Sequence, residues 1–231
     1  MTDRNPPGVL AAAWLVARKD LTIELRTRTA FLASIVFAVL ALAIFYFTWD
    51  QSVVTAADRA PGVLWVVLTF SALIGLQRSF GVEEHDRAID ALIAAPIGRE
   101  SIYIGKALAN VIFLVALQVI AIPALVVFYN LPIGRWIGWV TLIIVLAIVG
   151  IVAVGTLFAA MAVNTRFAEL LLPMLSLPFF VPILLNGAQA STRVIAGRPL
   201  AEAWPWLRIL IGFDMVFAVA CALAFPLMLD E

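Results

Sequence analysis

Residues 136–165 read WIGWVTLIIVLAIVGIVAVGTLFAAMAVNT, a run without a charged side chain. The interior of a bilayer offers no partner for an exposed backbone amide, so a segment that crosses it as a single chain must be helical. About 20 apolar residues in helical form are long enough to cross. This run therefore predicts a membrane-spanning helix.

Five other stretches of the chain have the same character. Together the six predicted spans cover residues 29–49, 60–78, 104–129, 136–163, 170–187 and 206–229. The fifth carries Pro173, Pro178 and Pro182, and only Asp214 interrupts the sixth. We expect an all-α membrane protein whose six-span domain, residues 29–231, follows a cytoplasmic segment at residues 1–28 and holds a loop at residues 79–103.

The composition excludes several other classes of protein. Of the 231 residues, 64% are hydrophobic and 13% are charged, whereas soluble domains average about 45–50% apolar and 25% charged residues. The formal net charge is zero, which gives no reason to expect a nucleic-acid partner. One cysteine, Cys221, and one histidine, His85, rule out a disulfide framework and a Cys/His metal site, so we expect no intrinsic cofactor or metal.

The distribution of basic and aromatic residues predicts the orientation of the chain. With a cytoplasmic N-terminus, ten basic residues fall on the inner side and five on the outer side, as the positive-inside rule requires. The inner residues are Arg4, Arg18, Lys19, Arg26, Arg28, Arg78, Arg87, Arg99, Lys106 and Arg166, and the outer ones are Arg59, Arg135, Arg193, Arg198 and Arg208. Trp49, Trp65, Trp136, Trp139, Trp204 and Trp206 all fall near the predicted outer ends, as in an aromatic belt. Both termini are therefore expected in the cytoplasm.

The segment before the first span is amphipathic. Leu10, Trp14, Ala17, Leu21 and Leu25 recur at helical spacing, with Lys19 and Arg26 opposite. Such a helix is expected to lie in the membrane interface, either as a generic anchor on membrane lipids or as the elbow helix of an exporter. The segment is too long and too structured for the start of a signal peptide.

The loop between the second and third spans is the most polar part of the chain. Val82, His85, Ile89, Leu92 and Ile93 share a helical face, and Pro96 with Gly98 ends the predicted helix. Glu83, Glu84, Asp86 and Asp90 occupy its other faces. An apolar ridge with acidic flanks suits a groove on a cytosolic partner better than an anionic lipid surface, which would repel it.

Motifs for catalysis are missing. The string from Gly98 to Lys106 has the wrong spacing for a phosphate-binding loop, and HExxH and GxSxG do not occur. We therefore expect no catalytic residues in this chain, and any energy from ATP must enter through another subunit.

Four polar residues near the outer side are candidate ligand contacts. Asp214 lies inside a span, where an ionisable group is a candidate functional residue, although a structural role is equally open. Arg193, Arg198 and Arg208 run against the positive-inside trend and suit an anionic ligand or lipid head groups. Residues 187–205 form either a re-entrant or an interfacial element.

Several stretches resemble the haem exporter protein B family, the membrane subunit of an ABC complex in cytochrome c maturation. They are ARKDLTIELRTR at 17–28, PGVLWVVLTFSALIGLQRSF at 61–80, EEHDRAIDALIAAP at 83–96 and LLLPMLSLPFFVPILL at 170–185. The chain departs from the family pattern at Gln77, where members often have an acidic residue, and near Arg87, where they often have a glycine.

The resemblance implies an ABC-2-type exporter permease in the bacterial inner membrane. It also implies two copies of this subunit clamped by two copies of a soluble ATPase, a neighbouring haem-handling membrane subunit, and haem as the transported or handled ligand. A permease for a drug, lipid or polysaccharide, and a non-transporting scaffold for haem-handling proteins, are the alternatives. A membrane enzyme fits least, since no catalytic group of residues is present.

Overall fold

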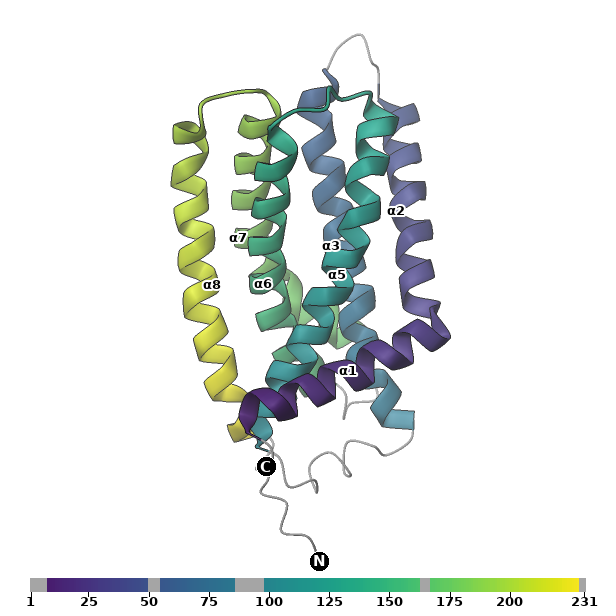
Figure 1. Ribbon diagram of the computed structural model, residues 1–231, viewed down its shortest axis with the longest axis vertical. Coiled ribbons are helices and arrows are strands. Elements are labelled where there is room, and N and C mark those ends of the chain that lie inside the picture. The colour runs from purple at the N-terminus through teal and green to yellow at the C-terminus, as the bar shows by residue number, and fades with distance from the viewer. Residues whose placement is uncertain (1–7, 50–54, 86–97, 163–166, 229–231) are drawn as a thin grey trace, which may run out of the picture.

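A computed structural model describes residues 8–49, 55–85, 98–162 and 167–228, and every regular element in these ranges is a helix. The helices are α1 Val9–Thr27, α2 Thr29–Thr48, α3 Ala56–His85, α5 Arg99–Tyr129, α6 Trp136–Ala162, α7 Ala168–Ile195 and α8 Leu200–Met228. Six of them run side by side along the long axis, and α1 crosses their lower end (Figure 1).

The six long helices confirm the predicted number of spans. Each contains a segment apolar and long enough to cross a bilayer. Four of the helices, α3, α5, α7 and α8, are longer than the predicted spans: α5 begins at Arg99, α7 continues to Ile195 and α8 begins at Leu200. Polar residues at these ends still complete the backbone hydrogen-bond ladder, so a helix can continue past the apolar run that predicts a span.

The segment 187–205 consists of two helix ends joined by a tight turn. Gly197 has a φ of +70°, which favours glycine, and the Arg198 N–H donates to the Arg193 carbonyl at 3.0 Å. Pro199 follows and α8 starts at the next residue. Neither a re-entrant loop nor a separate interfacial helix occupies these residues, because α7 continues through three prolines without ending.

Close contacts with glycine bring the long helices together. A Cβ added to Gly187 of α7 would lie 2.1 Å from the Trp65 ring of α3, so this packing requires glycine. Trp65 also donates its indole N–H to the Ser191 hydroxyl at 3.3 Å. The assignment of Trp65 to an outer aromatic belt was therefore wrong, since its indole is buried among helices and has a partner there. Trp49, Trp139 and Trp204 do remain exposed.

One residue joins α1 to α2 and turns the chain sharply. Arg28 has a φ of 55°, and its N–H donates to the Glu24 carbonyl at 2.7 Å. α1 packs along α5, where a Cβ on Gly105 would meet the Ala13 carbonyl oxygen at 2.6 Å. Ala17, predicted on the lipid-facing stripe, is buried on this packed side instead. Leu10, Trp14 and Leu25 remain exposed.

Candidate functional site

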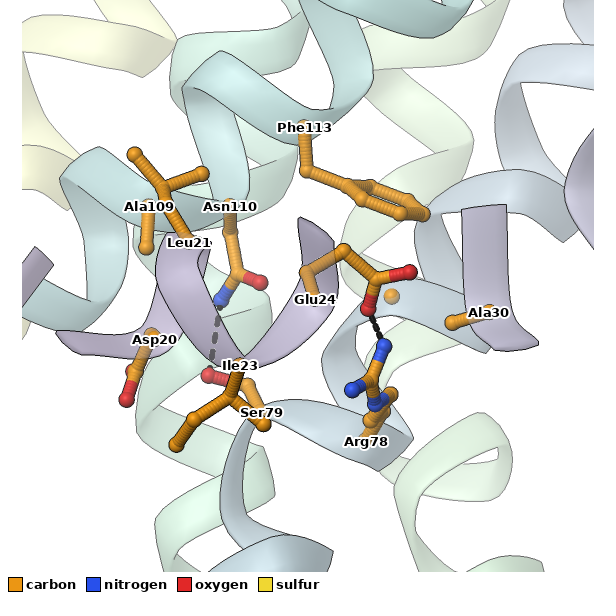
Figure 2. Close-up of a pocket in the computed structure, with 11 residues that line it drawn as sticks. Asp20, Leu21, Ile23, Glu24, Ala30, Arg78, Ser79, Ala109, Asn110 and Phe113 are labelled. Atoms are coloured by element: carbon orange, nitrogen blue, oxygen red, sulfur yellow. Dashed lines mark hydrogen bonds and ion pairs between the residues drawn. The ribbon is translucent and has the colours of Figure 1, made fainter. Parts of the chain in front are cut away.

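Charged side chains gather where α1 crosses the lower ends of α3 and α5. We call this group the polar junction. Its members are Asp20, Glu24, Arg78, Ser79, Lys106 and Asn110. Asp20 and Glu24 are one turn apart on α1 and therefore share the face that packs on the bundle. Figure 2 shows Glu24 and Arg78 pointing toward each other, and Asn110 pointing toward Ser79.

The Glu24 carboxylate connects three helices. It forms an ion pair with Arg78 of α3 and accepts the backbone N–H of Phe31, in the first turn of α2, at 3.0 Å. The first N–H groups of a helix have no intrahelical partner, so a carboxylate at that end is stabilising. Arg78 also donates to the Thr27 hydroxyl at 2.6 Å. The geometry of the α1–α2 corner therefore depends on Glu24 and Arg78 together.

Lys106 forms the second part of the junction. Its side chain is fully buried, and its ammonium lies 3.3 Å from an Asp20 carboxylate oxygen and 2.5 Å from the Ser79 carbonyl oxygen. The Asn110 amide donates to the Ser79 hydroxyl at 3.2 Å. A buried ammonium requires such acceptors, because burying an uncompensated charge costs several kcal/mol, on the order of 3–5. These contacts fix α1, α3 and α5 to one another.

A small pocket lies between the helices at this junction. It has a volume of about 50 Å³ and is lined mainly by α1, α3 and α5, with Gly75 and Phe113 on its apolar side. Ligand pockets measure about 300–1,000 Å³, so this one has room only for water-sized molecules. The junction therefore has no room for a molecule the size of an ordinary ligand.

The side chains that could bind a metal ion are dispersed in the part of the chain that the structure describes. No group of three His, Cys, Asp or Glu residues there lies close enough together to hold an ion.

The predicted loop helix begins as the last turn of α3. The backbone of α3 continues without interruption from Arg78 to His85, so it includes Val82, Glu83 and Glu84. The remaining predicted contact residues, Asp86, Ile89, Asp90, Leu92 and Ile93, lie outside the described residues. The first predicted contact residue, Val82, is thus less than one helical turn from Ser79 of the polar junction, on the same helix.

The three arginines predicted on the outer side lie around the α7–α8 turn and differ in their surroundings. Arg193 lies over the Trp206 ring, 4.9 Å from its centroid, and donates to Gln189. Arg198 pairs with Glu202 at 3.6 Å, and both side chains are exposed. Arg208 is exposed about two turns into α8. The arginines therefore share one end of the bundle but not one pocket.

Asp214 is a buried carboxylic acid in the middle of α8. Because α8 begins at Leu200, Asp214 is at the middle of the helix, about 21 Å from its start. The side chain is 7% exposed, and neither carboxylate oxygen has a hydrogen-bond partner among the residues of the structure. A Cβ on Gly150 of α6 would lie 2.2 Å from one of these oxygens. The carboxyl group thus occupies the space that glycine leaves on α6.

The polar junction itself was missed in the sequence. Arg78 and Lys106 counted there only as inner basic residues, and Asp20 and Glu24 had no assigned role. The sequence nevertheless held a signal. Asp20 and Glu24 are one helical turn apart in residues 9–28, where the other charged residues are basic. Arg78 directly follows the uncharged run of the second span, and Lys106 directly precedes that of the third. Pairing them required knowing that α1 folds back across α3 and α5.

The family model for CcmB protein matches residues 11–230. The chain belongs to the CcmB family. Relatives named "Heme exporter protein B" include one from Rhodobacter capsulatus, 30% identical over 179 residues (78% of this chain and 82% of the relative). Another, from Paracoccus denitrificans, is 30% identical over 208 residues (89% and 95%).

A third relative of the same name, from Bradyrhizobium diazoefficiens, is 26% identical over 215 residues (93% and 91%). The resemblance drawn from the four sequence stretches is thereby confirmed over most of the chain. With six apolar helices, this CcmB family member is a multi-pass membrane protein.

Proposed function

We propose that this chain is the permease subunit of an ABC-type transporter that exports or delivers haem for cytochrome c maturation in the bacterial inner membrane. The observation that carries the proposal is the family match over residues 11–230, together with relatives named for haem export. The six-helix bundle supports the role, since a permease must cross the membrane several times.

ATP hydrolysis is assigned to a separate soluble subunit, present in two copies beside two copies of this chain and a haem-handling membrane subunit. A chain without a phosphate-binding loop responds to ATP only through contact with a chain that has one. The loop helix Val82–Ala95 is the proposed contact, through Val82, Ile89, Leu92 and Ile93 with their acidic neighbours.

The polar junction supports this route for movement into the bundle. A force on the loop reaches His85, then Arg78 and Ser79 on the same unbroken helix. From there the Arg78–Glu24 ion pair carries it to α1, and the Ser79 carbonyl carries it to Lys106 of α5, which also pairs with Asp20 of α1. Coupling of this kind requires packed helices and ion pairs that can switch between two discrete arrangements.

At the other end of the bundle, Arg193, Arg198 and Arg208 are the proposed contacts for an anionic group such as a haem propionate. Guanidinium groups bind carboxylates with two parallel hydrogen bonds, which suits this ligand. Asp214 is the proposed internal polar group of the permease, at the contact of α6 with α8.

Co-purification tests the function directly. The full-length chain, extracted from membranes in mild detergent, should retain an ATP-hydrolysing subunit and haem-handling membrane proteins, with haem detected by its absorbance. A strain lacking the chain should fail to assemble c-type cytochromes and recover when it is restored. Retention of an ATPase with normal cytochromes c in the deleted strain would favour a permease for another substrate.

A further inference from the structure

The charged side chains of α1 are divided between two sides of the helix. Its acids, Asp20 and Glu24, point into the bundle, where Lys106 and Arg78 pair with them. Arg18 and Arg26 are exposed on the opposite side. Since the acids are already paired, the outward side of α1 is positively charged.

A shallow groove of about 320 Å³ lies on this basic side. It is lined by Leu15, Arg18, Lys19, Thr22, Ile23 and Arg26. Arg18, Thr22 and Arg26 recur every four residues, so they lie on one side of the helix. The Cα atoms of Arg18 and Arg26 are each about 6 Å from that of Thr22 along the helix axis, on either side of it. The Thr22 hydroxyl donates to the Arg18 carbonyl at 2.6 Å, which keeps this small side chain against the helix.

An uncovered apolar stripe runs beside the groove. Leu10, Trp14 and Leu25 are 79%, 52% and 72% exposed. At about 100° per residue, this stripe lies roughly a quarter turn from the arginines. A helix with adjacent apolar and basic faces lies in the membrane interface, where its apolar face contacts acyl chains and its basic face contacts head groups.

We propose that the groove of α1 binds the phosphodiester head group of an anionic phospholipid, with Arg18 and Arg26 donating to its phosphate oxygens. Guanidinium forks match phosphate oxygens in shape and charge. Anionic lipid is concentrated at the cytoplasmic surface, where α1 lies in the proposed orientation on which this assignment rests. The neighbouring Leu10, Trp14 and Leu25 favour lipid over a soluble protein, because they would contact its acyl chains.

The test uses the full-length protein in neutral detergent, titrated with mixed micelles containing dioleoylphosphatidylglycerol or dioleoylphosphatidylcholine. Phosphatidylglycerol should bind more tightly than phosphatidylcholine. The variant Arg18→Gln with Arg26→Gln should weaken binding of phosphatidylglycerol by roughly 30-fold, from the usual contribution of one basic residue near an anionic surface. The control, Arg135→Gln, removes one exposed positive charge at the other end of the bundle and should leave the affinity unchanged, whereas Arg18→Gln or Arg26→Gln alone should weaken binding.

Three outcomes overturn the assignment. The first is that the unchanged protein binds both lipids with equal affinity, or that the double variant binds phosphatidylglycerol as tightly as the unchanged protein does. The second is displacement of the lipid by inorganic phosphate at equal concentration, which identifies free phosphate as the ligand. The third is normal lipid binding by the double variant with loss of a co-purifying ATPase, which makes the groove a protein-docking surface. The lipid titration does not depend on cytochrome c assembly. A failure of the proposed haem function would therefore not contradict lipid binding, and a failure of lipid binding would not contradict the haem function.

Discussion

Glu24 is the residue on which most of the polar junction depends, because three helices meet at its carboxylate. Glu24→Ala removes the charged acceptor of the Arg78 guanidinium, which keeps its bond to Thr27, and the acceptor of the Phe31 N–H. Hydrogen bonds to charged groups contribute about 1.5–3 kcal/mol each, so we expect a loss of free energy of unfolding of that order. A lower midpoint of thermal unfolding in detergent would measure it.

Glu202→Ala is the matched control for that change. Glu202 also pairs with an arginine, Arg198, but both side chains are exposed and their charged atoms are 3.6 Å apart. Exposed pairs contribute about 0–1 kcal/mol. Equal shifts for the two variants would mean that Glu24 is no more than an ordinary surface partner of Arg78.

The contact of Asp214 with Gly150 makes a second prediction at the scale of single residues. Gly150→Ala should destabilise the bundle, since the added methyl group would lie 2.2 Å from an Asp214 carboxylate oxygen. Adding Asp214→Ala removes that oxygen and should restore part of the loss. Contacting residues show coupling energies of about 0.5–3 kcal/mol in a double-mutant cycle of thermal unfolding.

The appropriate comparison is Gly138→Ala on the same helix. A Cβ at Gly138 meets no atom within 4 Å, so this change should leave stability unaltered or raise it slightly. If Gly150→Ala and Asp214→Ala have strictly additive effects, the carboxyl group does not fill the space beside Gly150.

At the scale of helices, the sequence predicted the features that depend on hydropathy, namely the number of spans and their helical structure. The apolar runs identified six spans, because the lack of backbone partners in lipid forces each of them to be helical. The helices continue past the predicted spans where polar residues extend them, as at Arg99 of α5 and Ile195 of α7. The polar junction was not predictable in the same way, since the Glu24–Arg78 pair joins residues far apart in the chain.

The loop helix gives the prediction at this scale. Ile89→Asp with Leu92→Asp should let the chain insert normally but prevent it from retaining the ATPase subunit in pull-downs. Burying the two side chains in a partner groove would stabilise the complex by about 1.5–3 kcal/mol each, and the variant loses both. Assembly of c-type cytochromes should fail with the loss of binding.

Ala91→Asp with Ala94→Asp is the control for this pair. It adds the same two carboxylates to the opposite face of the predicted helix. Binding of the ATPase should survive in the control. If Ile89→Asp with Leu92→Asp also retains the ATPase and supports cytochrome c assembly, the coupling contact lies elsewhere on the cytoplasmic surface, with α1 the first candidate.

The whole molecule has two ends of different character. The polar junction and α1 lie at the lower end of Figure 1, toward which α3 extends past α1. The upper end carries the α7–α8 turn (Figure 1). Arg193 and Arg198 lie at this turn, and the exposed Trp49 and Trp204 lie at the end of α2 and near the start of α8. In the proposed orientation the upper end faces outward, and its exposed tryptophans suit a membrane–water interface there.

Cysteine labelling tests this orientation. Cys221, which is buried, is first replaced by alanine so that only an introduced thiol reacts. In intact cells, a membrane-impermeant maleimide should label Arg198→Cys and should reach Glu84→Cys only after the membrane is opened. Three spans, α5, α6 and α7, separate the two positions, so they must lie on opposite sides of the membrane. The reversed pattern would therefore contradict the cytoplasmic placement of the termini and of the ATPase contact. Labelling of both positions from the same side would contradict the six-span bundle itself.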